Sequence, residues 1–220
     1  MRKIITTTFI TLDGVMQAPG GPEEDRTNNF KWGGWSFHYW DEMMGNVMSD
    51  FMQRPFDLLL GRRTYEIFAA HWPFTENDPE VANKFNSTHK YVVSHKPMKL
   101  EWQNSSLITG VDELRKLKEE NGNELWVHGS RNLIQTLLAN NLIDTMHVWT
   151  FPVTVGNGKR LFEDGSKARA LKLVDSKTST TGVIISTYEP AGELKVGSFT
   201  LDNPTGAELE RRKRFAGEGS

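Results

Sequence analysis

The segment best suited to chemistry follows the apolar run 57–60, where Gly61 leads directly into Arg62, Arg63 and Thr64. A strand that ends in glycine and continues as a helix leaves the first amide N–H groups of that helix free. Together with the helix dipole, these groups bind anions. Two guanidinium groups at the same place match the geometry of phosphate oxygens. The pattern therefore indicates a phosphate site, and an ordinary strand-to-helix turn with solvated arginines is the alternative that the spacing leaves open.

Two other apolar runs end in residues of the same kind. One ends at His128 and is followed by Gly129 and Ser130, small residues that allow a ligand to approach the backbone at a helix start. Taken alone, this second segment is equally a tight turn. A third run ends in Ser94, close to the cationic Lys96. Because parallel strands end at one edge of a sheet, the three segments together predict a dinucleotide site, with a preference for the phosphorylated ribose of NADP.

The elements that position these segments alternate between strands and helices. We expect strands at 3–12, 57–60, 90–94, 105–108, 125–128, 146–153, 170–175 and 183–188, and helices at 41–53, 64–70, 111–120 and 132–139. This order predicts an α/β fold with a mostly parallel eight-stranded sheet, helices on both faces and an antiparallel C-terminal extension. Residues 17–40 hold four glycines and two prolines and predict a long loop over the sheet.

Composition narrows the range of functions. The chain of 220 residues has no cysteine, which excludes disulfides, thiolate nucleophiles and cysteine metal sites. Its net charge of −2 and the lack of a long apolar run argue against nucleic-acid and membrane partners, and we expect a cytoplasmic protein. No pair of histidines has metal-ligand spacing, so we expect no metal.

One domain is expected over residues 1–190, followed by a charged extension, 191–220, with a short helix at 205–215. The run Arg211-Arg212-Lys213-Arg214 in this helix suits phosphate binding, but interleaved glutamates make a solvated helix end or a packing arm the alternative reading.

The order of these motifs resembles a known family. The residues that carry the resemblance are Thr11-Leu12-Asp13-Gly14, Leu60 to Glu66, Val92-Val93-Ser94, Gly129-Ser130, Leu142-Ile143-Asp144, Pro152-Val153, Gly156-Asn157-Gly158 and Leu161-Phe162. Over residues 2–189 the chain is similar to the dihydrofolate-reductase-like superfamily, in the branch of the C-terminal reductase domain of the bacterial riboflavin-biosynthesis deaminase–reductase. The resemblance implies NADPH binding, a homodimer, and reduction of a small heterocycle such as a pterin or an aminopyrimidine.

The resemblance also assigns residues to the cofactor. By position, the nicotinamide would lie near Thr8, Leu12, Gly14 and Met16, the phosphates near Gly61, Arg62, Arg63, Thr64, Gly129, Ser130 and Arg131, and the 2′-phosphate near Ser94 and Lys96. The family carries paired glycines at the second turn, whereas here His128 precedes a single glycine. A nucleotide-binding or dimeric interaction module with little turnover is therefore the rival function.

A reductase also needs a source of protons. Dihydrofolate reductases use a carboxylate on their first helix, and here Asp41 and Glu42 open that helix. Both residues equally suit the favourable first turn of any helix. Asp13 is a second candidate at the sheet edge, although Asp-Gly is also a common turn. The aromatic residues between 30 and 40 could stack a flat substrate or form a packed lid or dimer contact.

Overall fold

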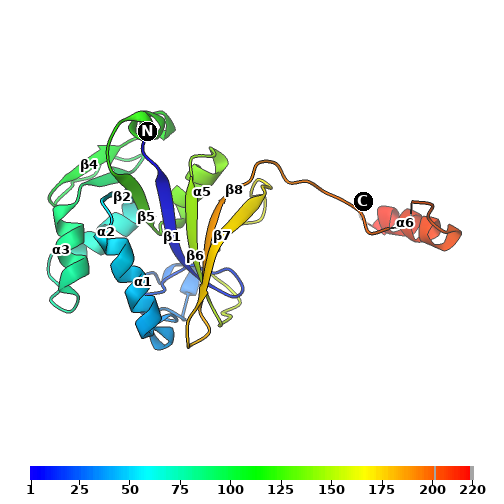
Figure 1. Ribbon diagram of the computed structural model, residues 1–220, viewed down its shortest axis with the longest axis horizontal. Helices are drawn as coiled ribbons and strands as arrows, with labels where there is room; N and C mark the ends of the chain where they lie inside the picture. Colours follow the sequence, from blue (N-terminus) through cyan, green and yellow to red (C-terminus); the bar gives the residue numbers. More distant parts are fainter. Residues whose placement is uncertain (201, 219–220) are drawn as a thin grey trace.

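The structure, a computed structural model, describes residues 1–200 and 202–218 and contains all eight expected strands. They are β1 (Ile4–Thr11), β2 (Phe56–Gly61), β3 (Lys90–Val93), β4 (Ser105–Ile108), β5 (Glu124–His128), β6 (Thr145–Phe151), β7 (Leu171–Thr178) and β8 (Ile184–Pro190). They form one sheet in the order β4-β3-β2-β5-β1-β6-β8-β7 (Figure 1). Strands β1 to β6 pair in parallel, whereas β8 runs antiparallel to β6 and β7, which confirms the expected antiparallel extension.

Six α-helices lie in the described part of the chain. They are α1 (Glu42–Gln53), α2 (Arg62–His71), α3 (Pro79–Ser87), α4 (Val111–Glu119), α5 (Arg131–Ala139) and α6 (Gly206–Glu218). Only α3 was not expected from the sequence. The start of α3 nevertheless has two common features of a helix N-terminus. Asp78 caps the helix by accepting a hydrogen bond from the amide of Val81 at 3.4 Å, and Pro79 occupies the first helical position.

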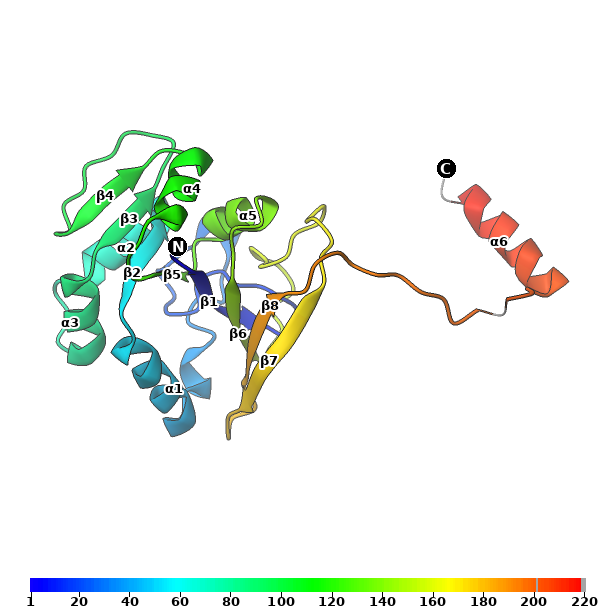
Figure 2. The ribbon, with the colours of Figure 1, turned by 45° about the horizontal axis from the view of Figure 1, so that its top comes forward.

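Helices cover both faces of the sheet, as its strand sequences require. In β5, Leu125 and Val127 pack into one apolar cluster with residues of α4 and α5, while Trp126 between them packs into another with α1, α2 and α3. Side chains that alternate between faces explain why all three are apolar in a strand buried on both sides. Figures 1 and 2 show the same arrangement of helices around the sheet.

The strand order brings the predicted phosphate segments together. Strands β2 and β5 are hydrogen-bonded neighbours in the sheet, and both run in the same direction. The turn after Gly61 and the turn at Gly129 therefore lie beside each other at the carboxyl edge, with the end of β3 next in line. The fold thus satisfies the geometric requirement for one ligand to span all three segments.

The C-terminal extension leaves the sheet after β8. The amide of Ala191 still donates to the carbonyl of Ala170 at 2.9 Å, and the amide of Ala170 donates to Gly192 at 3.2 Å. Residues 193–200 form no helix or strand and are exposed, and α6 stands away from the domain (Figure 2). No helix among residues 1–200 and 202–218 has both the length and the apolar character needed to cross a membrane.

Candidate functional site

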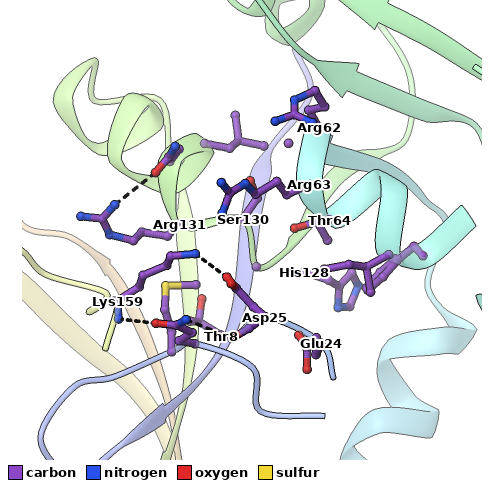
Figure 3. Close-up of a pocket in the computed structure, with 18 of the residues that line it drawn as sticks. Thr8, Glu24, Asp25, Arg62, Arg63, Thr64, His128, Ser130, Arg131 and Lys159 are labelled. Atoms are coloured by element: carbon purple, nitrogen blue, oxygen red, sulfur yellow. Dashed lines mark hydrogen bonds and ion pairs between the residues drawn. The ribbon is translucent and has the colours of Figure 1, made fainter. Parts of the chain in front are cut away.

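A cleft of about 740 Å³ opens where the three predicted segments meet (Figure 3). Its lining contains most of the predicted cofactor-binding residues: Thr8, Met16, Gly61, Arg62, Arg63, Thr64, Ser94, Lys96, His128, Gly129, Ser130 and Arg131. Leu12 and Gly14, also predicted for the nicotinamide, are not among the lining residues. The cleft extends from the starts of α2 and α5 to β1 and the segment Met16–Pro19.

The two helices that begin at the cleft have free N-termini. The residues before α2 and α5, Gly61 and Ser130, make no side-chain hydrogen bond to the first helical turn. In contrast, Asp41 and Asp78 cap α1 and α3 in the usual way. Unsatisfied amide groups and two helix dipoles therefore favour negative charge at this edge of the sheet.

The two turns are in close contact. A Cβ atom built on Gly61 would lie 1.9 Å from Oγ of Ser130, so a residue with a side chain does not fit at position 61 without movement of its neighbour. Gly129 and Ser130 both have left-handed backbone conformations, with φ of +80° and +69°. This conformation is strained for serine and is the kind of strain found where a backbone is shaped for a ligand.

Three arginines from these helices line the cleft. Arg62 pairs with Glu66, one turn along α2, at 2.7 Å. Arg131 pairs with Glu163, and its buried Nε atom has no hydrogen-bond partner among the described residues. Arg63 makes no hydrogen bond or ion pair with any described residue, so its guanidinium is available to an anion.

Ser94 lies at the end of β3 and is buried. Its hydroxyl donates to the carbonyl of Lys96 at 2.8 Å and accepts from the amide of the same residue at 3.2 Å. The hydroxyl therefore shapes the turn that exposes the Lys96 side chain at the cleft.

Residues that the sequence analysis missed form the opposite end of the cleft. Glu24 and Asp25 come from the long loop 17–40, and Lys159 forms an ion pair with Asp25 (Figure 3). Burial is the main cause that raises the pKa of Glu24 above its ordinary value. Burial would also raise the pKa of Asp25, but hydrogen bonds from Lys159 and Thr27 outweigh it and hold that pKa below the ordinary value.

The three predicted catalytic carboxylates are not among the lining residues. Asp41 accepts hydrogen bonds from the Met44 amide at 2.9 Å and the Thr180 hydroxyl at 2.7 Å, and these bonds lower its pKa. Glu42 is exposed in the first turn of α1. Their role as a proton source stays a prediction that this geometry does not favour.

Asp13 has a similar structural task. Its carboxylate accepts from the Thr11 hydroxyl at 2.5 Å and from the Gly156 amide at 2.8 Å, so it joins the end of β1 to the loop after β6. Although burial would raise the pKa of Asp13, these hydrogen bonds hold it below the ordinary value. A carboxylate of this kind stays ionised at neutral pH and is a poor source of protons.

None of the aromatic residues between 30 and 40 lines the cleft; Trp32 and Phe37 are exposed, and others pack against β6. Trp40 stacks on Trp149 of β6 with ring centroids 5.8 Å apart, and Trp35 lies edge-on to Phe151 at 5.2 Å. The predicted stacking platform is therefore not seen in the cleft lining, whose aromatic rings are Phe9, Phe68 and the imidazoles of His95 and His128.

Comparisons with known proteins agree with this geometry. A model of the RibD C-terminal domain family matches residues 2–185. The chain is 28% identical over 192 residues to the uncharacterized protein YyaP of Bacillus subtilis (strain 168), covering 85% of this chain and 94% of YyaP.

Two solved structures share the fold. A putative riboflavin biosynthesis protein from Shewanella sp. PV-4 is 21% identical with a TM-score of 0.59, covering 86% of this chain and 98% of that one. A dihydrofolate reductase from Enterococcus faecalis, complexed with NADP(H), is 14% identical with a TM-score of 0.54, covering 86% and 96%.

Proposed function

Because the chain belongs to the RibD C-terminal domain family, we propose that it is an NADPH-dependent reductase of a small heterocyclic substrate, a dihydrofolate-like pterin or an aminopyrimidine. The observation that carries the proposal is the pair of uncapped helix N-termini, at Gly61 and Ser130, that face one cleft together with the unpaired Arg63. Two anion sites within one cleft are what a pyrophosphate and a second phosphate require.

The proposed contacts follow the order of the segments along the cleft. The start of α5, with Gly129, Ser130 and Arg131, would bind the pyrophosphate. The start of α2 would bind the phosphates on the adenosine side, and Lys96 beside Ser94 would bind the 2′-phosphate. The nicotinamide would lie near Thr8 and Met16, with Leu12 and Gly14 on the same segment.

The polar groups in the cleft fit such a ligand. The buried hydroxyl of Thr8 and the buried Nε of Arg131 have no partner within the described chain, and buried polar groups are rarely left without one. When bound, NADPH supplies a hydride to the substrate. The chain's own contribution is to hold the nicotinamide ring in contact with the substrate ring, to exclude water, and to supply a proton.

A nucleotide-binding module with little turnover is the second candidate. Two observations favour it: His128 and Ser130 flank a single glycine at the second turn, and none of the carboxylates Asp13, Asp41 and Glu42 lines the cleft. In either case we expect a homodimer, which the family resemblance implies.

Loss of NADPH absorbance, followed with dihydrofolate and a panel of aminopyrimidines, separates the two candidates. Turnover of any member of the panel, with NADPH preferred over NADH, supports the reductase. Saturable binding of NADPH without turnover of the panel supports the binding module. Failure to bind NADPH contradicts both.

A further inference from the structure

Only two carboxylates line the cleft within the described part of the chain, and they differ in their surroundings. Asp25 is neutralised by Lys159 and also accepts hydrogen bonds from the amide and hydroxyl of Thr27. Glu24 forms no ion pair with a described residue. One of its oxygens, Oε2, accepts from the amide of Gly20 at 2.7 Å, and no described side chain donates to the other. Backbone amides of Gly20 and Gly21 therefore fix the position of the Glu24 carboxyl group, and no described side chain competes with a ligand for Oε1.

The loop that carries Glu24 is held in place by a buried side chain. The side-chain nitrogen Nε2 of Gln17 donates hydrogen bonds to the backbone carbonyls of Asp25 and Thr27, both at 3.0 Å. The side-chain oxygen Oε1 of Gln17 accepts a hydrogen bond from the backbone amide of Lys159 at 3.1 Å. The backbone carbonyl of Gln17 accepts one from the indole N–H of Trp35 at 2.8 Å. Glu24 thus lies on a rigid segment of the wall, which preorganises a group that must meet a reacting atom.

A second observation points to a ligand at this end of the cleft. Thr7 and Thr8 are both lining residues of the cleft, they are 5% and 2% exposed, and neither hydroxyl has a hydrogen-bond partner in the described structure. Figure 3 shows Thr8, Glu24 and Asp25 at the end opposite Arg62 and Arg63. Phosphate binding at the arginine end therefore leaves this end for the reacting rings.

We propose that Glu24, rather than Asp13, Asp41 or Glu42, donates the proton in the reduction, and that the substrate is a heterocycle whose reducible C=N bond places its nitrogen against Oε1 of Glu24. This proposal rests on the proposed reductase function. The proposal assigns to Glu24 the role of proton donor that the sequence analysis predicted for Asp41, Glu42 or Asp13.

The reaction balances with NADPH as the reductant. A hydride adds to the carbon of the C=N bond, the π electrons move to the nitrogen, and the nitrogen takes the proton of the Glu24 carboxyl group. NADP⁺ and a carboxylate remain, and water restores the proton through the open cleft. Burial raises the pKa of Glu24 and outweighs the amides of Gly20 and Gly21, which lower it, so the protonated acid is favoured before the step.

Other titratable groups around the cleft set the electrostatic background for Glu24. They are Asp25 and Lys159 at its own end and, along the remaining walls, Arg62, Arg63, His95, Lys96, His128 and Arg131. Since Lys159 already pairs with Asp25, no described cation holds Glu24 in its ionised form.

The test compares Glu24→Gln with Glu23→Gln. The amide side chain of the first variant keeps an acceptor for the Gly20 amide but has no acidic proton to donate, and Glu23 is an exposed neighbour paired with Arg26. With the substrate that turns over in the NADPH assay, we expect kcat of Glu24→Gln to fall at least about 100-fold. Its affinity for NADPH should stay within twofold of the original, and the decline of kcat at alkaline pH should disappear. Glu23→Gln should match the original protein in all three.

A second readout needs no turnover. In protein labelled with ¹³C at glutamate carboxyl groups, the resonance missing from Glu24→Gln should titrate above the ordinary pH range of glutamate. It should also move when NADP⁺ is added, whereas the Glu23 resonance should do neither. Turnover by Glu24→Gln within threefold of the original, or an ordinary titration of Glu24, overturns the proposal. If NADPH binds but nothing in the panel is reduced, the reductase function fails, and the titration of Glu24 alone decides whether the cleft holds a protonated acid.

Discussion

Two histidines whose Nε2 atoms are buried make the folded protein less stable at acid pH. His147 of β6 bonds to the Thr187 hydroxyl through Nδ1 at 2.9 Å and packs 4.6 Å from the Phe51 ring, and His128 lies among aromatic rings. In both residues Nε2 is buried without a partner among the described residues. Burial lowers the pKa of each to about 4 from an ordinary 6.5. Both imidazoles are therefore neutral in the folded protein at physiological pH.

The lowered pKa values of His128 and His147 make the stability of the folded protein depend on pH. Between pH 6.5 and 4 the unfolded chain binds more protons than the folded one, so the free energy of unfolding falls as the pH is lowered. Each histidine contributes up to about 1.4 kcal/mol per pH unit in this window. Urea unfolding at a series of pH values should show this loss, and His128→Phe should reduce it. The exposed His38 offers a control, since His38→Gln should leave the loss unchanged; an equally steep loss in His128→Phe would contradict the assignment.

At the scale of elements, the contact between the starts of α2 and α5 is the feature most open to mutation. Gly61→Ala would place a methyl group 1.9 Å from Oγ and 2.8 Å from Cβ of Ser130. We expect this substitution to lower the free energy of unfolding by about 1–3 kcal/mol, as overpacking does. Denaturant titration measures the change.

Two further variants make this prediction specific. The double variant Gly61→Ala with Ser130→Gly removes both close atoms and relieves the left-handed serine, so it should recover most of the loss. Gly45→Ala in α1 meets nothing within 4 Å and should be neutral or stabilising, because alanine favours a helix. A neutral Gly61→Ala would show that the two turns are not in contact.

Elements with strong periodicity could be predicted from the sequence, and those without it could not. The strands alternate or are continuously apolar, so all eight were expected within a few residues of their bounds. Helix α3 was missed because few apolar residues mark its length, although Asp78 and Pro79 signal its start.

In the candidate site too, the residues that follow a strand could be predicted from the sequence, and the loop residues could not. Arg63 and Ser130 follow strands, and the end of a parallel strand fixes where such residues lie. Glu24 lies in a loop rich in glycine and proline, where no period relates sequence to position, and its place in the cleft depends on bonds made by Gln17. Asp41 suits a helix cap and a catalytic acid equally well as a residue type, and only its partners, Met44 and Thr180, distinguish the two roles.

At the scale of the whole molecule, the extension after β8 contributes little to the domain. Residues 194–200 and 202–217 are mostly exposed, and α6 lies away from the sheet (Figure 1). A chain that ends at Glu193 keeps the hydrogen bonds between Ala170 and residues 191 and 192. It should therefore unfold within about 0.5 kcal/mol of the full chain and bind NADPH equally well. A marked, concentration-dependent loss of stability would instead identify the extension as an arm that packs on a second copy.

The binding of NADPH, measured by quenching of tryptophan fluorescence, tests the central claim that the free starts of α2 and α5 hold the phosphates of the cofactor. The seven tryptophans provide the signal. Arg62→Ala with Arg63→Ala should weaken binding by several kcal/mol at most, since each charged contact contributes roughly 1.5–3 kcal/mol. Arg115→Ala, on the remote helix α4, should leave the affinity unchanged. Equal affinity for NADPH in the double variant and the original protein would contradict the account.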